Sequence, residues 1–154
     1  HHHEWEYVVT FDADGQMHIG DIDKFIHAFS HEPSLDVVIG SRLLEGSIVE
    51  KMPWYRRFIV LVLWRIFTRM ISGHSPSDPH NGFRMLRTAV VQDIHLTMDG
   101  FEYSSELIDE IVLRGYKWKD VPVHIRYDAY TLGKWQKASN AINIALKMIY
   151  KKLF

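Results

Sequence analysis

Asp12 and Asp14, one residue apart and followed by Gly15, are the side chains of this chain best suited to chemistry. They follow the strand-like run 4–11, which ends in the sequence Val-Val-Thr-Phe. Magnesium binds through one or two carboxylates and completes its shell with water and substrate phosphate oxygens. Because ligands of open α/β sheets bind beyond the carboxyl ends of the strands, the pattern predicts a divalent cation that bridges to a pyrophosphate.

The same motif occurs in other structural and functional settings. An Asp-x-Asp-Gly sequence is also common in turns, since Asp hydrogen-bonds its local backbone and Gly adopts φ > 0. A calcium-binding EF-hand needs Gly and Glu at its sixth and twelfth positions, and Met17 and Asp23 stand there. Haloacid-dehalogenase-like phosphatases share the motif, but Gln16 replaces their usual Thr and no late acidic pair follows.

The composition is that of a globular domain and excludes several function classes. The chain has 154 residues, of which 47% are hydrophobic and 24% charged, enough for one domain with its own core. It has 18 basic and 19 acidic residues, so we expect no nucleic-acid partner. The absence of cysteine excludes disulfides, thiolate zinc sites and cysteine nucleophiles. Residues 1–3 are all His and resemble a purification-tag remnant.

Strand and helix patterns alternate along the chain, which predicts an α/β fold. We expect a loop over 41–53, another over 74–81, and Pro122 near a sheet edge. The predicted strands cover 5–11, 35–40, 83–87 and 116–127, and the predicted helices cover 21–31, 54–72, 88–94, 102–114 and 135–154.

Further motifs follow the Asp-x-Asp sequence in a fixed order. They are Val38–Arg42, Ser77–Arg84, Gly100–Tyr103, and Arg114–Tyr116 with Val121–Val123. Together they resemble the family 2 glycosyltransferases, and within them the dolichyl-phosphate mannosyltransferase-like branch. The resemblance implies a GT-A-like mixed sheet flanked by helices. It also implies an enzyme that moves a sugar, with inversion, from a nucleotide-sugar donor to a polyprenyl or dolichyl phosphate.

Members of that family carry further βα units ahead of the Asp-x-Asp strand, and these units hold most contacts to the nucleoside. We therefore expect residues 4–137 to be the C-terminal part of a catalytic domain that lacks its N-terminal nucleoside-binding half. A sheet without those strands would expose a long edge. For this reason we expect a homo-oligomer or a complementing chain.

The resemblance also implies roles for acidic and basic side chains. Asp12 and Asp14 would hold Mg²⁺ or Mn²⁺, which neutralises the charge on the departing nucleoside diphosphate. Four basic residues are expected to bind phosphate, although exposed Arg and Lys in turns and loops would look the same. They are Arg42, Arg84, Arg126 and Lys134.

Asp78 and Glu106 are the catalytic candidates on the acceptor side. Asp78 is expected to orient the acceptor or complete the site, unless its segment is only a turn. Many polysaccharide-making relatives carry an acidic base near the start of the next helix, where this chain has Tyr103 and Ser104. A hydroxyl acceptor needs such a base, whereas a phosphate monoester is already anionic. The departure favours a polyprenyl-phosphate acceptor, with Glu106 expected to position substrate or pair with an Arg.

Two segments bear on membrane association. The apolar helix 54–72 contains Arg65 and Arg69, and a bilayer span takes about 20 largely apolar residues. An interfacial or buried helix is therefore expected there. The helix 138–154 is basic and amphipathic, as are helices that lie on anionic membranes, although it could also pack on the sheet. We expect a cytoplasmic protein, peripheral to the cytosolic membrane face, with the membrane surface as a partner.

Alternative functions remain open at this point. The acceptor could be a hydroxyl of a glycolipid or polysaccharide. The chain could also be a catalytically inert module that binds a membrane or a partner. A phosphatase is a more remote reading of the Asp12 motif.

Overall fold

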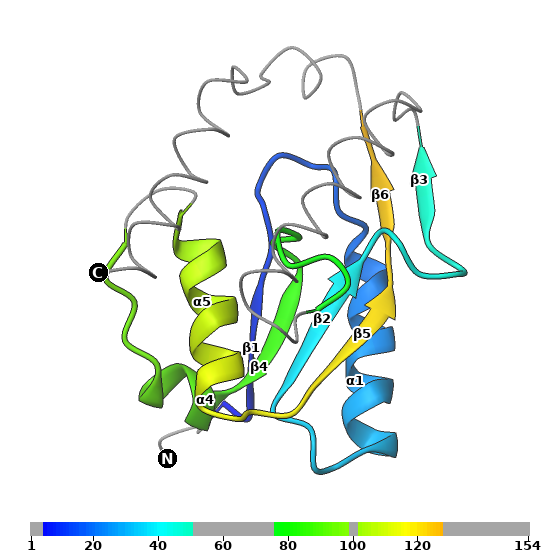
Figure 1. Ribbon diagram of the computed structural model, residues 1–154. Helices are drawn as coiled ribbons and strands as arrows, with labels where there is room; N and C mark the ends of the chain where they lie inside the picture. The colour runs from blue at the N-terminus through cyan, green and yellow to red at the C-terminus, as the bar shows by residue number, and fades with distance from the viewer. Residues whose placement is uncertain (1–4, 51–75, 99–101, 128–154) are drawn as a thin grey trace.

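A four-stranded mixed sheet organises the chain in the computed structural model, which describes residues 5–50, 76–98 and 102–127 (Figure 1). The strand order is β1-β4-β2-β5. β4 runs antiparallel to both β1 and β2, whereas β2 and β5 are parallel. The expected α/β fold with a mixed sheet is confirmed. The bounds of the strands are Tyr7–Thr10 for β1, Val37–Ser41 for β2, Arg84–Arg87 for β4 and Trp118–Pro122 for β5.

A second, two-stranded sheet corrects two predictions. β3 (Ile48–Glu50) lies within the segment expected to be a loop, and it pairs in parallel with β6 (His124–Arg126). The single strand expected over 116–127 is therefore two strands in two sheets. Pro122 ends β5, which lies at an edge of the first sheet as predicted. The chain then continues into β6 beside β3, and the Ile48 amide donates to the Val123 carbonyl at 3.1 Å.

Three helices match their predicted positions closely. They are α1 (Ile22–His31), α4 (Thr88–Asp93) and α5 (Glu102–Leu113), and a 3₁₀ turn over Ile19–Asp21 leads into α1. Gly115 follows α5 with φ of 73°. This left-handed conformation is easy for glycine and ends the helix where the sequence indicated.

The helices α1 and α5 cover opposite faces of the four-stranded sheet (Figure 1). Val38 of β2 packs in a cluster with Phe25 and Phe29 of α1. Its neighbours Val37 and Ile39 pack instead with Leu107, Ile108 and Ile111 of α5. Because successive residues of a strand point to opposite faces, β2 is buried on both sides and lies at the centre of the fold.

Several predictions fall outside the described residues. They are the apolar helix 54–72, the helices proposed over 135–154 and 138–154, the tag remnant 1–3, and Lys134. Among the residues that the structure describes, no helix has both the length and the apolar character to cross a bilayer.

The packing of α1 predicts unequal effects for two adjacent residues. Phe25 is fully buried and meets Phe83 edge to face, with ring centroids 4.7 Å apart. Phe25→Ala should lower the free energy of unfolding by about 3–5 kcal/mol. Ile26 is 48% exposed, so Ile26→Ala should change it by only about 0.5 kcal/mol. Urea unfolding followed by circular dichroism measures both, and equal losses would contradict this packing.

Candidate functional site

The ends of β1 and β4 bring two sequence motifs together. Thr10 of β1 pairs with Arg84 of β4, and the Thr10 hydroxyl donates to the Gly82 carbonyl at 2.9 Å. Continuing this antiparallel register by two residues places Asp12 opposite Gly82. The Asp12 carboxylate does lie directly against the Gly82 backbone. The acidic motif and the Asn81–Arg84 segment, about 70 residues apart in sequence, therefore share one end of the sheet.

The Asp14 carboxylate is bound by its own turn. The Gln16 backbone amide donates to Asp14 Oδ1 at 3.1 Å, and the Gln16 side-chain amide donates to Oδ2 at 2.7 Å. Gly15 between them has φ of 76°. The local turn chemistry is thus present, as the alternative reading of the motif required. In the sequence, Gln16 was noted only because it replaces the Thr that is usual in phosphatases. Its hydrogen bonds to Asp14 add a side-chain amide to the site.

The pKa of the Asp12 carboxyl reflects its burial and its charged neighbours. Partial burial, together with the negative charge of Asp14, raises the pKa of Asp12 above its usual value, and Arg84 and Arg42 act in the opposite direction. A cation held by both carboxylates would relieve this repulsion. Within the described ranges no group of three His, Asp or Glu side chains is placed to hold a metal ion. Two carboxylates and one amide nonetheless fit Mg²⁺ or Mn²⁺, which take oxygen ligands and complete their shell with water and phosphate.

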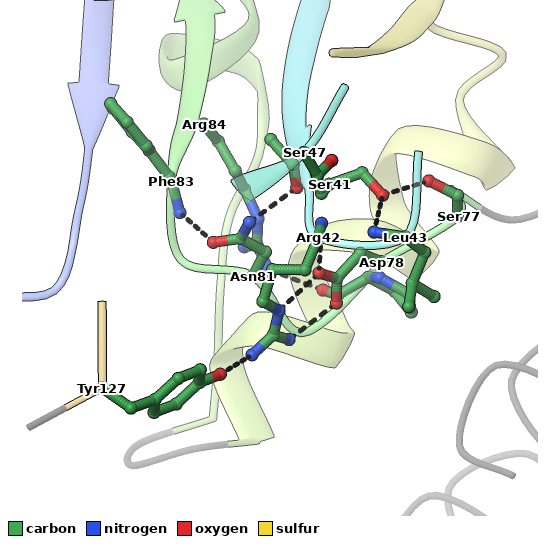
Figure 2. A network of polar contacts seen from close by, with 12 residues as sticks. Ser41, Arg42, Leu43, Ser47, Ser77, Asp78, Asn81, Phe83, Arg84 and Tyr127 are labelled. Carbon is green, nitrogen blue, oxygen red and sulfur yellow. Dashed lines mark hydrogen bonds and ion pairs between the residues drawn. The ribbon is translucent and has the colours of Figure 1, made fainter. Parts of the chain in front are cut away.

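Asp78 and Arg42 form a bidentate ion pair at the end of β2 (Figure 2). Arg42 donates from Nε to Asp78 Oδ2 at 2.6 Å and from Nη2 to Oδ1 at 2.7 Å, and its third nitrogen donates to the Tyr127 hydroxyl at 2.9 Å. Burial by itself would raise the pKa of Asp78. The charge and hydrogen bonds of Arg42 outweigh it and hold that pKa below its usual value.

In this pair, two residues predicted to contact substrate bind each other. Both oxygens of Asp78 are engaged by Arg42, whose backbone amide also donates to Oδ2 at 3.1 Å. The observed contacts therefore give Asp78 and Arg42 a structural task, which is to join the 76–82 segment to β2. Direct contact of Arg42 with phosphate, or of Asp78 with an acceptor, stays a prediction.

Other polar side chains, buried or partly buried, secure the same segment (Figure 2). Asn81 donates from its amide to the Gly40 carbonyl at 2.8 Å and accepts from the Phe83 backbone amide at 3.1 Å. The Ser77 hydroxyl donates to that of Ser41 at 2.7 Å. Since buried polar groups are costly unless they are hydrogen-bonded, these contacts define one position for the segment.

Arg84 is a buried cation at the base of the site. The residue is only 1% exposed. Its Nη2 atom donates to the Pro79 carbonyl at 2.7 Å and to the Ser104 hydroxyl at 2.5 Å. Among the described residues it forms no ion pair, and its Nε has no hydrogen-bond partner. Burial lowers the pKa of Arg84 to about 10, opposed by the charges of Tyr103, Asp12 and Asp78.

The location of Arg84 changes how its expected role is understood. The charge of this buried residue acts on Asp12. Direct contact of the Arg84 guanidinium with phosphate stays a prediction. Ser104 occupies the place where many relatives in the resembled family carry a base. Here a hydroxyl bound to a guanidinium stands at that place. Neither group is suited to remove a proton from an acceptor.

Glu106 is occupied by the segment ahead of α5. Its carboxylate accepts from the Thr97 amide at 2.9 Å, the Thr97 hydroxyl at 2.7 Å and the Met98 amide at 2.8 Å. The residue is 4% exposed. These contacts indicate that Glu106 fixes the 97–98 backbone, and a part in substrate positioning stays a prediction.

β6 brings Arg126 beside the acidic turn. The Arg126 amide donates to the Gln16 carbonyl at 2.9 Å, and Met17 forms an antiparallel bridge with Ile125. The Arg126 side chain is exposed. Of the predicted phosphate binders in the described ranges, Arg126 is therefore the one whose side chain is open to solvent next to the Asp14 turn.

Comparison with known proteins agrees with these motifs. An uncharacterised protein of Methanocaldococcus jannaschii is 30% identical over 149 residues, which are 96% of this chain and 60% of that protein. A dolichol-phosphate mannosyltransferase of Pyrococcus furiosus is 32% identical over 146 residues, 93% of this chain and 39% of the relative. A UDP-N-acetylglucosamine–dolichyl-phosphate N-acetylglucosaminyltransferase of Methanococcus voltae is 27% identical over 149 residues, 94% of this chain and 56% of the relative.

The matches cover most of this chain but only part of each relative. No protein-family model matches the chain. The chain spans 39% to 60% of the length of the three relatives. The two named transferases support the resemblance to family 2 glycosyltransferases.

The Arg42–Asp78 pair predicts a pH-dependent stability. Asp78→Asn leaves the partly buried Arg42 without its buried counter-charge and should lower the free energy of unfolding by about 3–5 kcal/mol at pH 7. The native pKa of Asp78 lies below the unfolded value, which is about 4. The contribution is therefore complete above that value and is lost as the pH falls through the native pKa.

Urea unfolding of wild type and Asp78→Asn at pH 7 and near pH 3 tests this expectation. The difference between the two proteins should shrink at the lower pH. Asp93→Asn is the matched control, because Asp93 pairs with Arg114 on the surface. A loss at Asp93 as large as that at Asp78 would show that burial of the Arg42 pair is unimportant.

Proposed function

We propose that this chain is part of a family 2 glycosyltransferase that uses Mg²⁺ or Mn²⁺ to transfer a sugar, with inversion, from a nucleotide-sugar donor to a polyprenyl phosphate. The observation that carries the proposal is the arrangement around Arg84. The charge of the Asp12 carboxylate acts on this buried cation, and the Arg84 guanidinium also donates to the Ser104 hydroxyl. The site therefore combines candidate metal ligands with a positive charge and offers no base at the Ser104 position.

The donor side of the proposal rests on Asp12, Asp14 and Arg126. Asp12 and Asp14 would hold the cation, which when bound neutralises charge on the departing nucleoside diphosphate. Gln16 holds the Asp14 carboxylate in its turn. Arg126, open to solvent beside this turn, adds a positive charge for the same diphosphate.

The acceptor side rests on the chemistry of a phosphate monoester. One of its anionic oxygens attacks the anomeric carbon and forms the new C–O bond, while the bond from that carbon to the nucleoside diphosphate breaks. No proton has to be removed from the nucleophile, so the absence of a base at Ser104 is not an obstacle. A single displacement of this kind inverts the anomeric configuration.

The names of the relatives agree on the acceptor but not on the sugar. The names of the two transferases both contain a dolichol or dolichyl phosphate, but one specifies mannose and the other N-acetylglucosamine. We therefore propose a polyprenyl-phosphate acceptor and leave the sugar open. Because such lipids reside in membranes, the proposal includes peripheral association with the cytosolic membrane face.

The proposal also includes a second chain or copy beside β1. In the described part of the chain, β1 pairs only with β4 and is an edge of its sheet. Trp5, just before it, is 75% exposed. An open strand edge of this kind favours pairing with another strand.

Calorimetry with GDP or UDP and Mn²⁺ tests the donor site. Wild type should bind one of these nucleotides in a Mn²⁺-dependent manner, and Asp12→Asn should weaken this binding at least about tenfold, or 1.4 kcal/mol, because one metal ligand loses its charge. Asp23 is an exposed residue of α1, so Asp23→Asn should bind the nucleotide and Mn²⁺ as wild type does. Absence of Mn²⁺-dependent binding in wild type would favour the inert module.

Transfer assays test the acceptor. Polyprenyl phosphate should accept sugar, while the matching polyprenol, which lacks only the phosphate, should not. Equal transfer to both would favour an enzyme that acts on hydroxyl groups and would overturn the phosphate-specific proposal.

A further inference from the structure

Gly82 is a glycine that its own backbone does not explain. The described glycines with positive φ are Gly15, Gly46 and Gly115. Gly82 is not one of them, so an alanine could adopt its conformation without backbone strain. The reason for a glycine at this position has to lie in the space around it.

That space is taken by the Asp12 carboxylate. A Cβ atom added to Gly82 would lie 2.6 Å from Asp12 Oδ1, 2.9 Å from Cγ and 2.9 Å from Oδ2. All three distances are too short for real contacts, and all three atoms belong to one carboxylate. A methyl group at position 82 and the observed Asp12 side chain cannot therefore coexist.

The backbone at position 82 is held too firmly to move aside. The Thr10 hydroxyl donates to the Gly82 carbonyl from the neighbouring strand at 2.9 Å. On one side Asn81 is joined to the Gly40 carbonyl at 2.8 Å, and on the other the Phe83 amide donates to Asn81 at 3.1 Å. Phe83 itself is 1% exposed in the core. The open direction is that of Asp12, whose residue is exposed to solvent.

We propose that Gly82 is a positioning residue for Asp12. The missing side chain lets the Asp12 carboxylate lie across the end of β4, where it shares the site with Asp14. A side chain at position 82 turns that carboxylate away, so that cation binding weakens although residue 82 touches no cation. This inference rests on the proposed metal-dependent function and adds to it the residue that sets the geometry of one ligand.

Mn²⁺ binding in the presence of GDP or UDP, measured from the electron paramagnetic resonance signal of free Mn²⁺, tests the proposal. Gly82→Ala should bind Mn²⁺ at least about tenfold more weakly than wild type. Gly20→Ala is the matched control, because a Cβ there would also meet a side chain, that of His18 at 2.8 Å. Its affinity should equal that of wild type.

The outcomes separate this inference from the function on which it rests. If wild type and Asp12→Asn both fail to bind Mn²⁺, the metal-dependent function is wrong. If Asp12→Asn loses binding while Gly82→Ala keeps it, the positioning role is wrong and the function stands.

A double-mutant cycle tests the contact without any metal. Gly82→Ala should lower the urea midpoint in the wild-type background and lower it less in the Asp12→Ala background, because the obstructing carboxylate is gone. If Gly82→Ala does not fold, recovery of folding in the Asp12→Ala/Gly82→Ala protein supports the contact. Additive effects, or failure of that double variant to recover, would overturn it.

Discussion

The buried ion pair between Arg42 and Asp78 is the interaction on which the site depends. It joins the end of β2 to the segment that leads into β4 through two side-chain hydrogen bonds of 2.6 and 2.7 Å. Burying two charges is costly, and the cost is offset only when geometry and further hydrogen bonds are good. Here the Tyr127 hydroxyl and the Arg42 amide add such bonds. The pair therefore specifies one position for the segment, and Gly82 and Arg84 follow from that position.

In the described part of the chain, some charged side chains at the end of the sheet are paired, and others are not. The charge of Arg42 is matched by Asp78, so it adds little to the field of the site. Arg84 has no ion-pair partner among the described residues, and Asp12 and Asp14 repel each other. A site that holds a divalent cation next to carboxylates, and an anionic acceptor near a buried guanidinium, would satisfy both imbalances.

Local sequence patterns were sufficient for most individual elements. The helix predicted over 21–31 matches α1, and the helix predicted over 102–114 matches α5, which Gly115 follows. β3 was missed because it has only three residues and its partner, β6, lies about 75 residues away in sequence. The run 116–127 was read as one strand because its alternation continues through Pro122. The separation into two sheets depends on neighbours that such a pattern does not reveal.

The sequence by itself determined the chemistry available at the site: carboxylates one residue apart after a strand, a glycine before a Phe-Arg pair, and a serine instead of an acid at position 104. The tertiary structure decided which of these groups are free. It paired Asp78 with Arg42, engaged Glu106 with the 97–98 backbone, and placed Asp12 over Gly82. The physical reason is that an element forms from the side chains of its immediate neighbours, whereas a buried charge is defined by the partner that the fold brings within hydrogen-bonding distance.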